Sequence, residues 1–242
     1  MLRSNLGTFG RNGEDERYNL ILTNPPYVTS GSASIRAAID SEGLGEYYPN
    51  GGRGTEALAI QWIVEHLKLE GEAFVIVPDG LMNQETMLAM IKQQCEVLCV
   101  VALPSRTFYS TPKKTYILGV RRKKTPKEQR SPVFTYLVSE IGESRDTRRV
   151  PVEVNDLVAM VEQFRFFRAS PDVFSSSEAR CRLVPWPEFD QMRNWLVDRN
   201  WTHDEKVDLG IVEEAFEVGP DEFRDLVGDA RAALDALMKE LA

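Results

Sequence analysis

The stretch that decides the fold is Tyr18-Asn19-Leu20-Ile21-Leu22-Thr23-Asn24-Pro25-Pro26-Tyr27. Its first half is a short and nearly continuous apolar run, which is typical of a strand buried on both faces of a parallel sheet. Two consecutive prolines then end the strand, and they stiffen the backbone because each ring fixes φ and restricts the residue before it. We therefore predict a strand over residues 17–23 with a rigid turn at its carboxyl end.

Beyond this turn, apolar runs of strand length alternate with amphipathic segments of helix length. Strands are predicted at about 73–77, 97–103, 115–120 and 133–138, and helices at about 56–69, 84–94 and 155–167. This alternation indicates βαβ units, and hence an α/β fold with a parallel sheet. We expect the strands at 17–23, 73–77 and 97–103 to lie side by side, so that Asn24, Pro78 and Pro104 share one edge.

The chain separates into three regions by composition. Residues 1–16 are polar and predict a tail, 17–168 carry the α/β pattern, and 169–242 form a mixed region that ends in a helix over 220–242. In that helix, apolar residues recur at close to the 3.5-residue period of a helix that pairs with another helix. It packs either on the chain's own domain or on a partner subunit.

Composition excludes several classes of protein. The 242 residues include 29 basic and 37 acidic side chains, and the net charge of −8 argues against non-specific coating of nucleic acid. No apolar run approaches membrane-spanning length and no secretory signal opens the chain, so we expect a cytoplasmic protein with no membrane partner. The three cysteines form no disulfide framework, and the two histidines lie near no cysteine, so no metal site is predicted.

The rigid turn after the first strand offers a specific chemistry. It can aim the amide oxygen of Asn24 and the carbonyl of Pro25 at one point, and two converging acceptors suit an NH₂ group. Accepting both hydrogen bonds of a conjugated amine frees its lone pair for reaction, and the aromatic face of Tyr27 suits a flipped, planar base. The plain alternative is that Asn-Pro-Pro-Tyr is only a turn after a strand.

At these residues the sequence resembles the amino-methylating DNA methyltransferases, and most of all the modification subunits of type I restriction systems. The likeness continues through the segment 67–80, then through 103–108, which is followed by Lys113-Lys114-Thr115. It implies the C-terminal half of a Rossmann-like class I methyltransferase sheet that uses S-adenosylmethionine.

The resemblance also implies residue roles in an adenine-N6 methyltransferase. Asn24 and the carbonyl of Pro25, stiffened by Pro26, accept from N6 of a flipped adenine, and Tyr27 stacks on the base. Phe108 packs on the base from another side.

Four further positions stay open between two interpretations. Tyr109 is an alternative to Phe108 as the second stacking residue, and Phe108 is then a core aromatic. Asp79 lies near the mouth of the site or is a turn residue. Lys113 and Lys114 contact DNA phosphates or belong to a solvated loop.

The family's S-adenosylmethionine site lies upstream of the catalytic strand, in a glycine-rich turn, and only 16 residues precede that strand in this sequence. Gly7, Gly10 and Gly13 follow no predicted strand. We therefore expect the acceptor half of an active site without most of the donor half, whether as a fragment, a shortened gene product or part of a split enzyme. By itself the chain should bind S-adenosylmethionine weakly or not at all.

The resemblance implies double-stranded DNA as a partner, together with a DNA-specificity subunit and either a second modification subunit or the missing N-terminal half. Two alternatives stay open. One is a release-factor glutamine or rRNA guanine methyltransferase with the same tetrapeptide, although the segment 111–115 favours the DNA family. The other is a non-catalytic interaction subunit.

Overall fold

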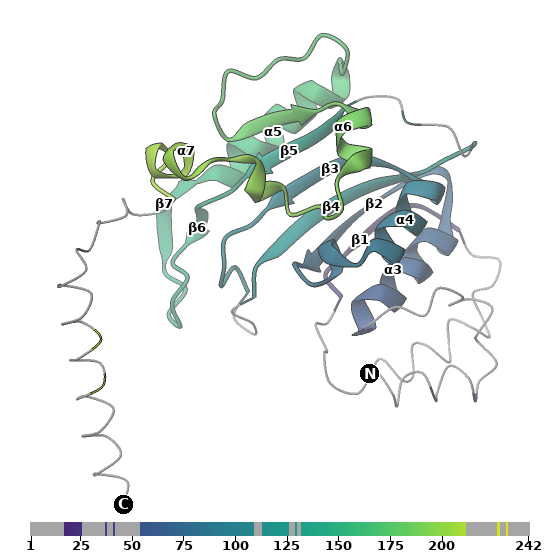
Figure 1. Ribbon diagram of the computed structural model, residues 1–242, viewed down its shortest axis with the longest axis horizontal. Helices are drawn as coiled ribbons and strands as arrows, with labels where there is room; N and C mark the ends of the chain where they lie inside the picture. Colours follow the sequence, from purple (N-terminus) through teal and green to yellow (C-terminus); the bar gives the residue numbers. More distant parts are fainter. Residues whose placement is uncertain are drawn as a thin grey trace, which may run out of the picture. The chain divides into compact units, whose positions relative to one another are not determined.

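The computed structural model describes residues 17–25, 37, 41, 54–108, 113–125, 129, 132–211, 227 and 231. The chain divides into two compact units, Met1–Trp201 and Thr202–Ala242. The first unit holds a six-stranded sheet (Figure 1). In the second unit, the helix α7 (His203–Asp208) begins with a capping box between Thr202 and Glu205.

The six strands have the order β1-β2-β4-β3-β5-β8. Their bounds are β1 (Tyr18–Thr23), β2 (Leu67–Pro78), β3 (Cys95–Ala102), β4 (Thr115–Arg122), β5 (Val133–Leu137) and β8 (Cys181–Val184). β1 pairs with β2, and β3 with β5, in parallel, whereas β4 and β8 run antiparallel to their neighbours. The strands β1, β2, β3 and β5 therefore point the same way, which confirms the predicted α/β class with a mostly parallel sheet.

The prediction that β2 lies beside β3 is wrong, because β4 lies between them. None of the described residues between β3 and β4 is helical, and a strand that returns without a crossover helix pairs antiparallel with its predecessor. The predicted shared edge is nevertheless present. Pro78 pairs with Thr115, and the N–H of Leu103 donates to the carbonyl of Thr115 at 3.0 Å. Since β1 runs parallel to β2, Asn24, Pro78 and Pro104 lie at the same end of the sheet.

Helices cover both faces of the sheet. Figure 1 shows α3 (Gly54–His66) and α4 (Glu85–Gln94) in front of the sheet and α5 (Asp156–Ala169) behind it. The predicted apolar stripe of α3 is buried, with Ile60 and Ile63 at most 3% exposed. The short segments η1 (Leu81–Asn83), α6 (Trp186–Gln191) and η2 (Val197–Asn200) complete this unit.

The helix α3 ends earlier than predicted, since β2 already begins at Leu67. Gly71 lies within β2 beside β1, where the pairing shifts register between Tyr18 and Leu20. A Cβ at position 71 would lie 2.7 Å from the carbonyl oxygen of Tyr18. Only glycine permits so close an approach of two backbones.

The core between the sheet and α5 is rich in aromatic side chains. The ring of Phe134 on β5 lies 5.2 Å from that of Phe164 and 5.6 Å from that of Phe167, both on α5. Cys99 is buried in the same cluster. Burial raises the pKa of its thiol to about 12, so this cysteine is a protonated core residue.

A two-stranded hairpin, which the sequence did not predict, follows β5. It pairs β6 (Ile141–Glu143) with β7 (Pro151–Asn155) in antiparallel orientation. At its base, Oδ2 of Asp156 accepts hydrogen bonds from the backbone N–H groups of Ser139 and Glu140 at 2.7 and 3.0 Å. The base is therefore fixed to the first turn of α5.

The region predicted over 169–242 contributes to both units. Its strand β8 pairs with β5 and extends the sheet. Trp195 and Trp201 are buried within the first unit. The predicted helix over 220–242 lies outside the described residues except for Val227 and Arg231, which are helical and exposed.

Candidate active site

The candidate site lies where the parallel strands end. Asn24 and Pro25 follow β1 directly, Asn24 is exposed and Pro25 is buried. Pro26 and Tyr27, the remaining residues of the predicted motif, lie outside the described residues. Ligands bind at the carboxyl ends of the strands in open parallel sheets. Asn24 therefore lies at the edge of the sheet where a ligand is expected to bind.

The turn after β2 forms the neighbouring part of this edge. Oδ1 of Asp79 accepts from the N–H of Gly80 at 2.7 Å, and the N–H of Asp79 donates to the carbonyl of Lys114 at 3.2 Å. Nδ2 of Asn83 donates to the carbonyl of Asp79 at 3.2 Å. These contacts support the interpretation of Asp79 as a turn residue that joins the ends of β2 and β4.

The loop after β3 carries Phe108, the predicted stacking residue. Oγ1 of Thr107 donates to the carbonyl of Pro104 at 2.7 Å and closes the loop on itself. Phe108 is half-buried and packs against the core cluster under α5. Its side chain therefore contacts the core without being fully buried. Tyr109, the alternative, lies outside the described residues.

The two lysines of the predicted DNA contact differ. Lys113 is exposed, whereas Nζ of Lys114 bonds Oδ2 of Asp198 at 2.7 Å. The hydroxyl of Tyr116 donates to the other oxygen of Asp198 at 2.6 Å. Burial and the hydrogen bond to Asp198 raise the pKa of Tyr116 well above its usual value, so the phenol stays protonated as a donor. Lys114 thus helps to fasten η2 to the end of β4.

Sequence reasoning missed Asp198 and Arg149, which make the long-range polar contacts near this edge. Arg149, near the end of the β6–β7 hairpin, bonds the carbonyls of Arg106 and Thr107. Neither residue belongs to a periodic segment or a motif, so no local signal marked it.

The described residues do not by themselves provide the cofactor site that the resemblance implies. No strand in the described ranges is followed directly by a turn with several glycines, and Gly7, Gly10 and Gly13 lie outside those ranges. Across the same residues, no group of three His, Cys, Asp or Glu side chains is placed to hold a metal ion.

Comparison with known proteins identifies the family. Residues 4–185 match the family model of the N-6 DNA Methylases. The chain therefore belongs to the N-6 DNA methylase family. It is 31% identical over 121 residues to the methylase subunit of the type I restriction enzyme EcoEI from Escherichia coli. That alignment covers 47% of this chain and 23% of the subunit.

Solved structures show the same fold. A chain of a type I restriction-modification system superposes with a TM-score of 0.59 at 18% identity, covering 94% of this chain and 45% of the other. The methyltransferase subunit of such a system from Streptococcus thermophilus has a TM-score of 0.52 at 16% identity, covering 79% and 40%. The chain thus spans less than half the length of these relatives. In the part of the chain that is described, no helix is long and apolar enough to cross a bilayer.

The predicted family and fold class are thereby confirmed. The roles of Asn24, Pro25, Pro26, Tyr27, Phe108, Lys113 and Lys114 stay predictions.

Proposed function

We propose that this chain is the adenine-binding, acceptor part of a DNA adenine-N6 methyltransferase of a restriction-modification system. The observation that carries the proposal is the position of Asn24-Pro25 directly after a parallel strand, at the sheet edge that also holds the loop of Phe108. A flipped adenine bound there would present its N6 amine to the Asn24 side chain and the Pro25 carbonyl. Tyr27 and Phe108 would hold the ring by stacking.

The acceptors act mainly in the transition state. Positive charge develops on N6 as its lone pair is used, and both oxygens then hold the amine more strongly than in the ground state. With the cofactor bound, N6 would form its bond to the methyl carbon as the methyl–sulfur bond breaks and the neutral thioether S-adenosylhomocysteine leaves. N6 would then lose its extra proton to solvent. S-adenosylmethionine supplies the methyl group, and we propose that a separate cofactor-binding half holds it.

The outer strand of the described sheet supports this division. Among the described residues, β1 has a neighbouring strand, β2, along one of its two edges only. Leu20 and Leu22 on this strand are 55% and 69% exposed. An apolar edge strand invites pairing with another chain and is normally covered. A cofactor-binding half that continues the sheet beyond β1 would bury both leucines.

Further partners follow from the same family. Duplex DNA is the proposed substrate, with Lys113, which is exposed, as a contact to its phosphates. Lys114 is proposed for the same role only if DNA displaces Asp198 from its ammonium group. A DNA-specificity subunit is the proposed partner of the helix over 220–242.

The test is methyl transfer by the complete enzyme, meaning this chain joined to or co-expressed with the cofactor-binding half of a type I modification subunit. Asn24→Ala should lower kcat by at least about 100-fold, because it removes an acceptor that matters most in the transition state. Duplex affinity, measured by fluorescence anisotropy, should stay within a few-fold. Asn19→Ala is the matched control, since Asn19 is an exposed asparagine within the same strand.

A fully active Asn24→Ala enzyme refutes the assignment. Calorimetry on the 242-residue chain alone should detect little or no S-adenosylmethionine binding, and a micromolar affinity would contradict the proposed division. If the chain joins a cofactor-binding half and DNA without any transfer, it is a non-catalytic interaction subunit.

A further inference from the structure

Arg149 joins two segments that are far apart in the sequence. Its Nη1 donates to the carbonyl oxygen of Thr107 at 3.0 Å, and its Nη2 donates to that of Arg106 at 2.8 Å. The planar guanidinium thus spans two consecutive carbonyls of the loop that leads to Phe108. Nε is buried and makes no hydrogen bond within the described ranges. The side chain is therefore directed into the protein and holds the loop.

The hairpin end that carries Arg149 is itself well ordered. Oδ1 of Asp146 accepts from the hydroxyl of Ser144 at 2.8 Å and from the N–H of Arg148 at 2.9 Å. It also accepts from the N–H of Arg149 at 3.3 Å. The hydrogen bonds from Ser144 and the backbone hold the pKa of Asp146 below its usual value. The turn therefore keeps its acceptor charged at neutral pH.

The residues at both ends of this contact have an unusual backbone conformation. Arg106 and Arg149 have φ values of +62° and +52°, in the left-handed region that non-glycine residues rarely adopt. Such conformations persist where surrounding contacts determine them, and they concentrate at functional sites. Here the side chain of Arg149 bonds the carbonyl of Arg106, so that one contact joins the two turns.

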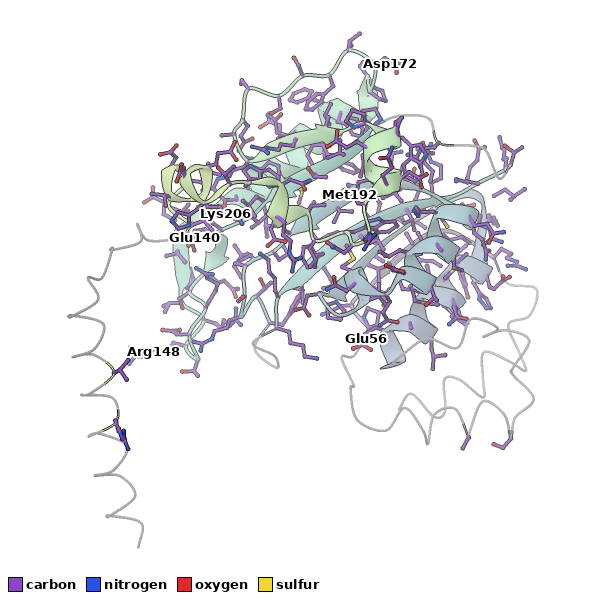
Figure 2. All side chains as sticks on the ribbon, viewed as in Figure 1. Glu56, Glu140, Arg148, Asp172, Met192 and Lys206 are labelled. Carbon is purple, nitrogen blue, oxygen red and sulfur yellow. The ribbon has the colours of Figure 1, made fainter. Side chains whose placement is uncertain are left out.

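The neighbouring residue Arg148 differs in its environment although it has the same charge. It is exposed, and its backbone N–H bonds Asp146. Figure 2 labels Arg148 at the far end of the hairpin and Glu140 at its base. A charge effect on DNA would involve Arg148 as much as Arg149, whereas an effect through the loop would involve Arg149 alone.

We propose that Arg149 is a positioning residue for adenine methylation, which holds the loop 104–108 so that its aromatic side chain reaches the flipped base. The inference rests on the proposed function. Arginine suits the role because its fork of donors matches two adjacent carbonyls, which the single ammonium of lysine does not. Displacing a stacking group by an ångström can cost about 100-fold in rate even when the displaced residue lies away from the reacting atoms.

The first experiment tests the contact in the 242-residue chain and needs no activity. Hydrogen–deuterium exchange is followed in peptides that span residues 103–110 for wild type, Arg149→Ala, Arg149→Lys and Arg148→Ala. Both Arg149 variants should exchange about tenfold faster or more in these peptides, since each loses hydrogen bonds from a charged donor. Arg148→Ala should match wild type. Equal exchange in all four chains overturns the proposal.

The second experiment uses the complete enzyme and a duplex with 2-aminopurine at the target adenine, whose fluorescence rises when the base unstacks and falls when it stacks on an aromatic ring. On the ordinary adenine duplex, Arg149→Ala should lower kcat by about 10- to 100-fold. The same variant should alter the fluorescence of the bound 2-aminopurine duplex, which has no N6 amine and reports only on stacking of the base. The dependence of DNA affinity on salt should stay as in wild type. Arg149→Lys keeps the charge and the stem, so it should show the same kcat loss if positioning is the cause.

The outcomes separate the causes. If Arg148→Ala and Arg149→Ala lower affinity equally, and each reduces the salt slope by about 0.9, both are phosphate contacts and the positioning role is refuted. Full rescue by Arg149→Lys refutes it as well. If Asn24→Ala is active while exchange at 103–110 still depends on Arg149, the proposed function has failed although the contact is real, and this inference fails with it.

Discussion

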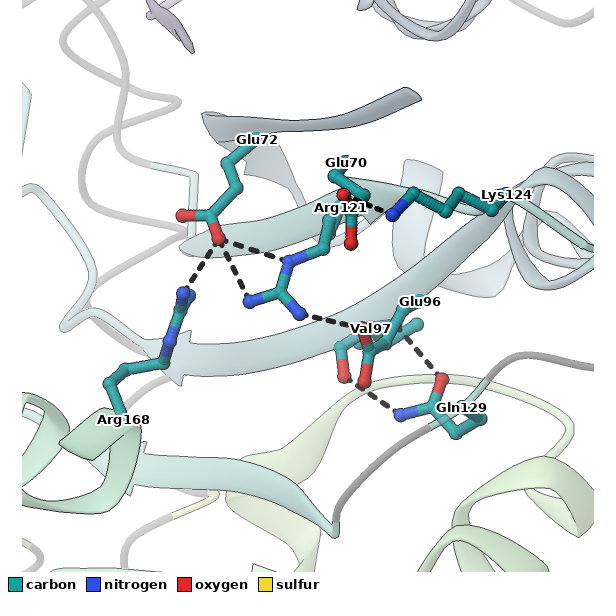
Figure 3. Close-up of polar contacts among 8 residues, drawn as sticks. All are labelled: Glu70, Glu72, Glu96, Val97, Arg121, Lys124, Gln129 and Arg168. Carbon is teal, nitrogen blue, oxygen red and sulfur yellow. Dashed lines mark hydrogen bonds and ion pairs between the residues drawn. The ribbon is translucent and has the colours of Figure 1, made fainter. Parts of the chain in front are cut away.

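Arg121→Met should destabilise the protein more than any other single change to the ion pairs at the amino-terminal end of the sheet. Arg121 on β4 lies directly opposite Glu72 on β2 and Glu96 on β3. Its Nε and Nη2 donate to Oε1 of Glu72 at 3.1 and 3.0 Å, and its Nη1 donates to Oε2 of Glu96 at 3.2 Å (Figure 3). One guanidinium therefore links three adjacent strands.

The magnitude follows from the burial of Glu96. Its side chain is only 2% exposed and that of Arg121 only 15%. Methionine keeps much of the arginine stem but leaves the Glu96 carboxylate without this cation in a buried position. Breaking a buried pair by removing one partner costs about 3–5 kcal/mol. We expect Arg121→Met to lower the free energy of unfolding by an amount in that range.

Arg168→Met is the matched comparison. Arg168 also bonds Glu72, at 2.6 Å, but its side chain is 29% exposed and that of Glu72 is 23% exposed. Partial exposure weakens the pair by solvent screening, and Glu72 keeps Arg121, so the expected loss is about 1 kcal/mol. Both variants are measured by urea unfolding at pH 7, with the midpoint and the slope fitted separately.

A double variant isolates the buried charge. Glu96→Gln in the Arg121→Met background removes the buried carboxylate charge and should recover more than half of the lost stability. Two results would contradict the reasoning. One is a loss in Arg121→Met no larger than in Arg168→Met, and the other is a double variant less stable than Arg121→Met alone.

Three further predictions follow from other contacts. Burial alone raises the pKa of Glu72, but hydrogen bonds and charges of Arg168 and then Arg121 outweigh it and lower the pKa. The stability that this group contributes should therefore be full above about pH 4.3 and be lost as pH falls below it. Urea midpoints at several pH values would measure this loss, which should be smaller in Arg168→Met. A Cβ at Gly119 would lie 2.5 Å from Sγ of Cys99, so Gly119→Ala should lower the free energy of unfolding by about 1–3 kcal/mol in the same assay. If adding Cys99→Ala leaves that loss unchanged, the steric contact is not its cause. Leu22→Asp should leave the unfolding midpoint nearly unchanged but abolish co-purification with a cofactor-binding half, and retained co-purification would place that interface elsewhere.

Local pattern predicted most of the parallel core. The run at Tyr18–Thr23 became β1, Asn24 and Pro25 follow it outside the strand, and α4 and β5 lie close to where periodicity placed them. These features depend on local signals between residues that are close in sequence, namely apolar alternation, turn-forming residues and helix caps. The candidate edge was predictable for the same reason, because strand direction alone brings Asn24, Pro78 and Pro104 together.

Strand order and long-range polar contacts were not predictable in this way. The insertion of β4 between β2 and β3 depends on which edges pair, and an isolated apolar run carries no information on its neighbour. A twelve-residue connection without helical period, 103–114, was the available sign of a direct return. Arg149 and Asp198 act on residues 42 and 84 positions away, a separation at which no periodicity operates.

The two ends of the sheet divide stability from the proposed chemistry. The ion pairs of Arg121 involve Glu72, in the middle of β2 and at the first of its pairings with β4, whereas Pro78 ends the same strand beside the candidate site, six residues from Glu72. At about 3.3 Å per residue that is about 20 Å, well beyond the range over which substitutions usually interact. Arg121→Met should therefore lower the unfolding free energy without changing kcat wherever the protein is still folded. If an Asn24 or Arg149 variant loses kcat while its urea midpoint is unchanged, the loss must then arise at the sheet edge that holds the candidate site. The opposite result is that kcat follows the unfolding free energy in variants at both ends of the sheet. The edge loops would then depend on the stability of the whole sheet, and the positioning role of Arg149 would lose its local basis.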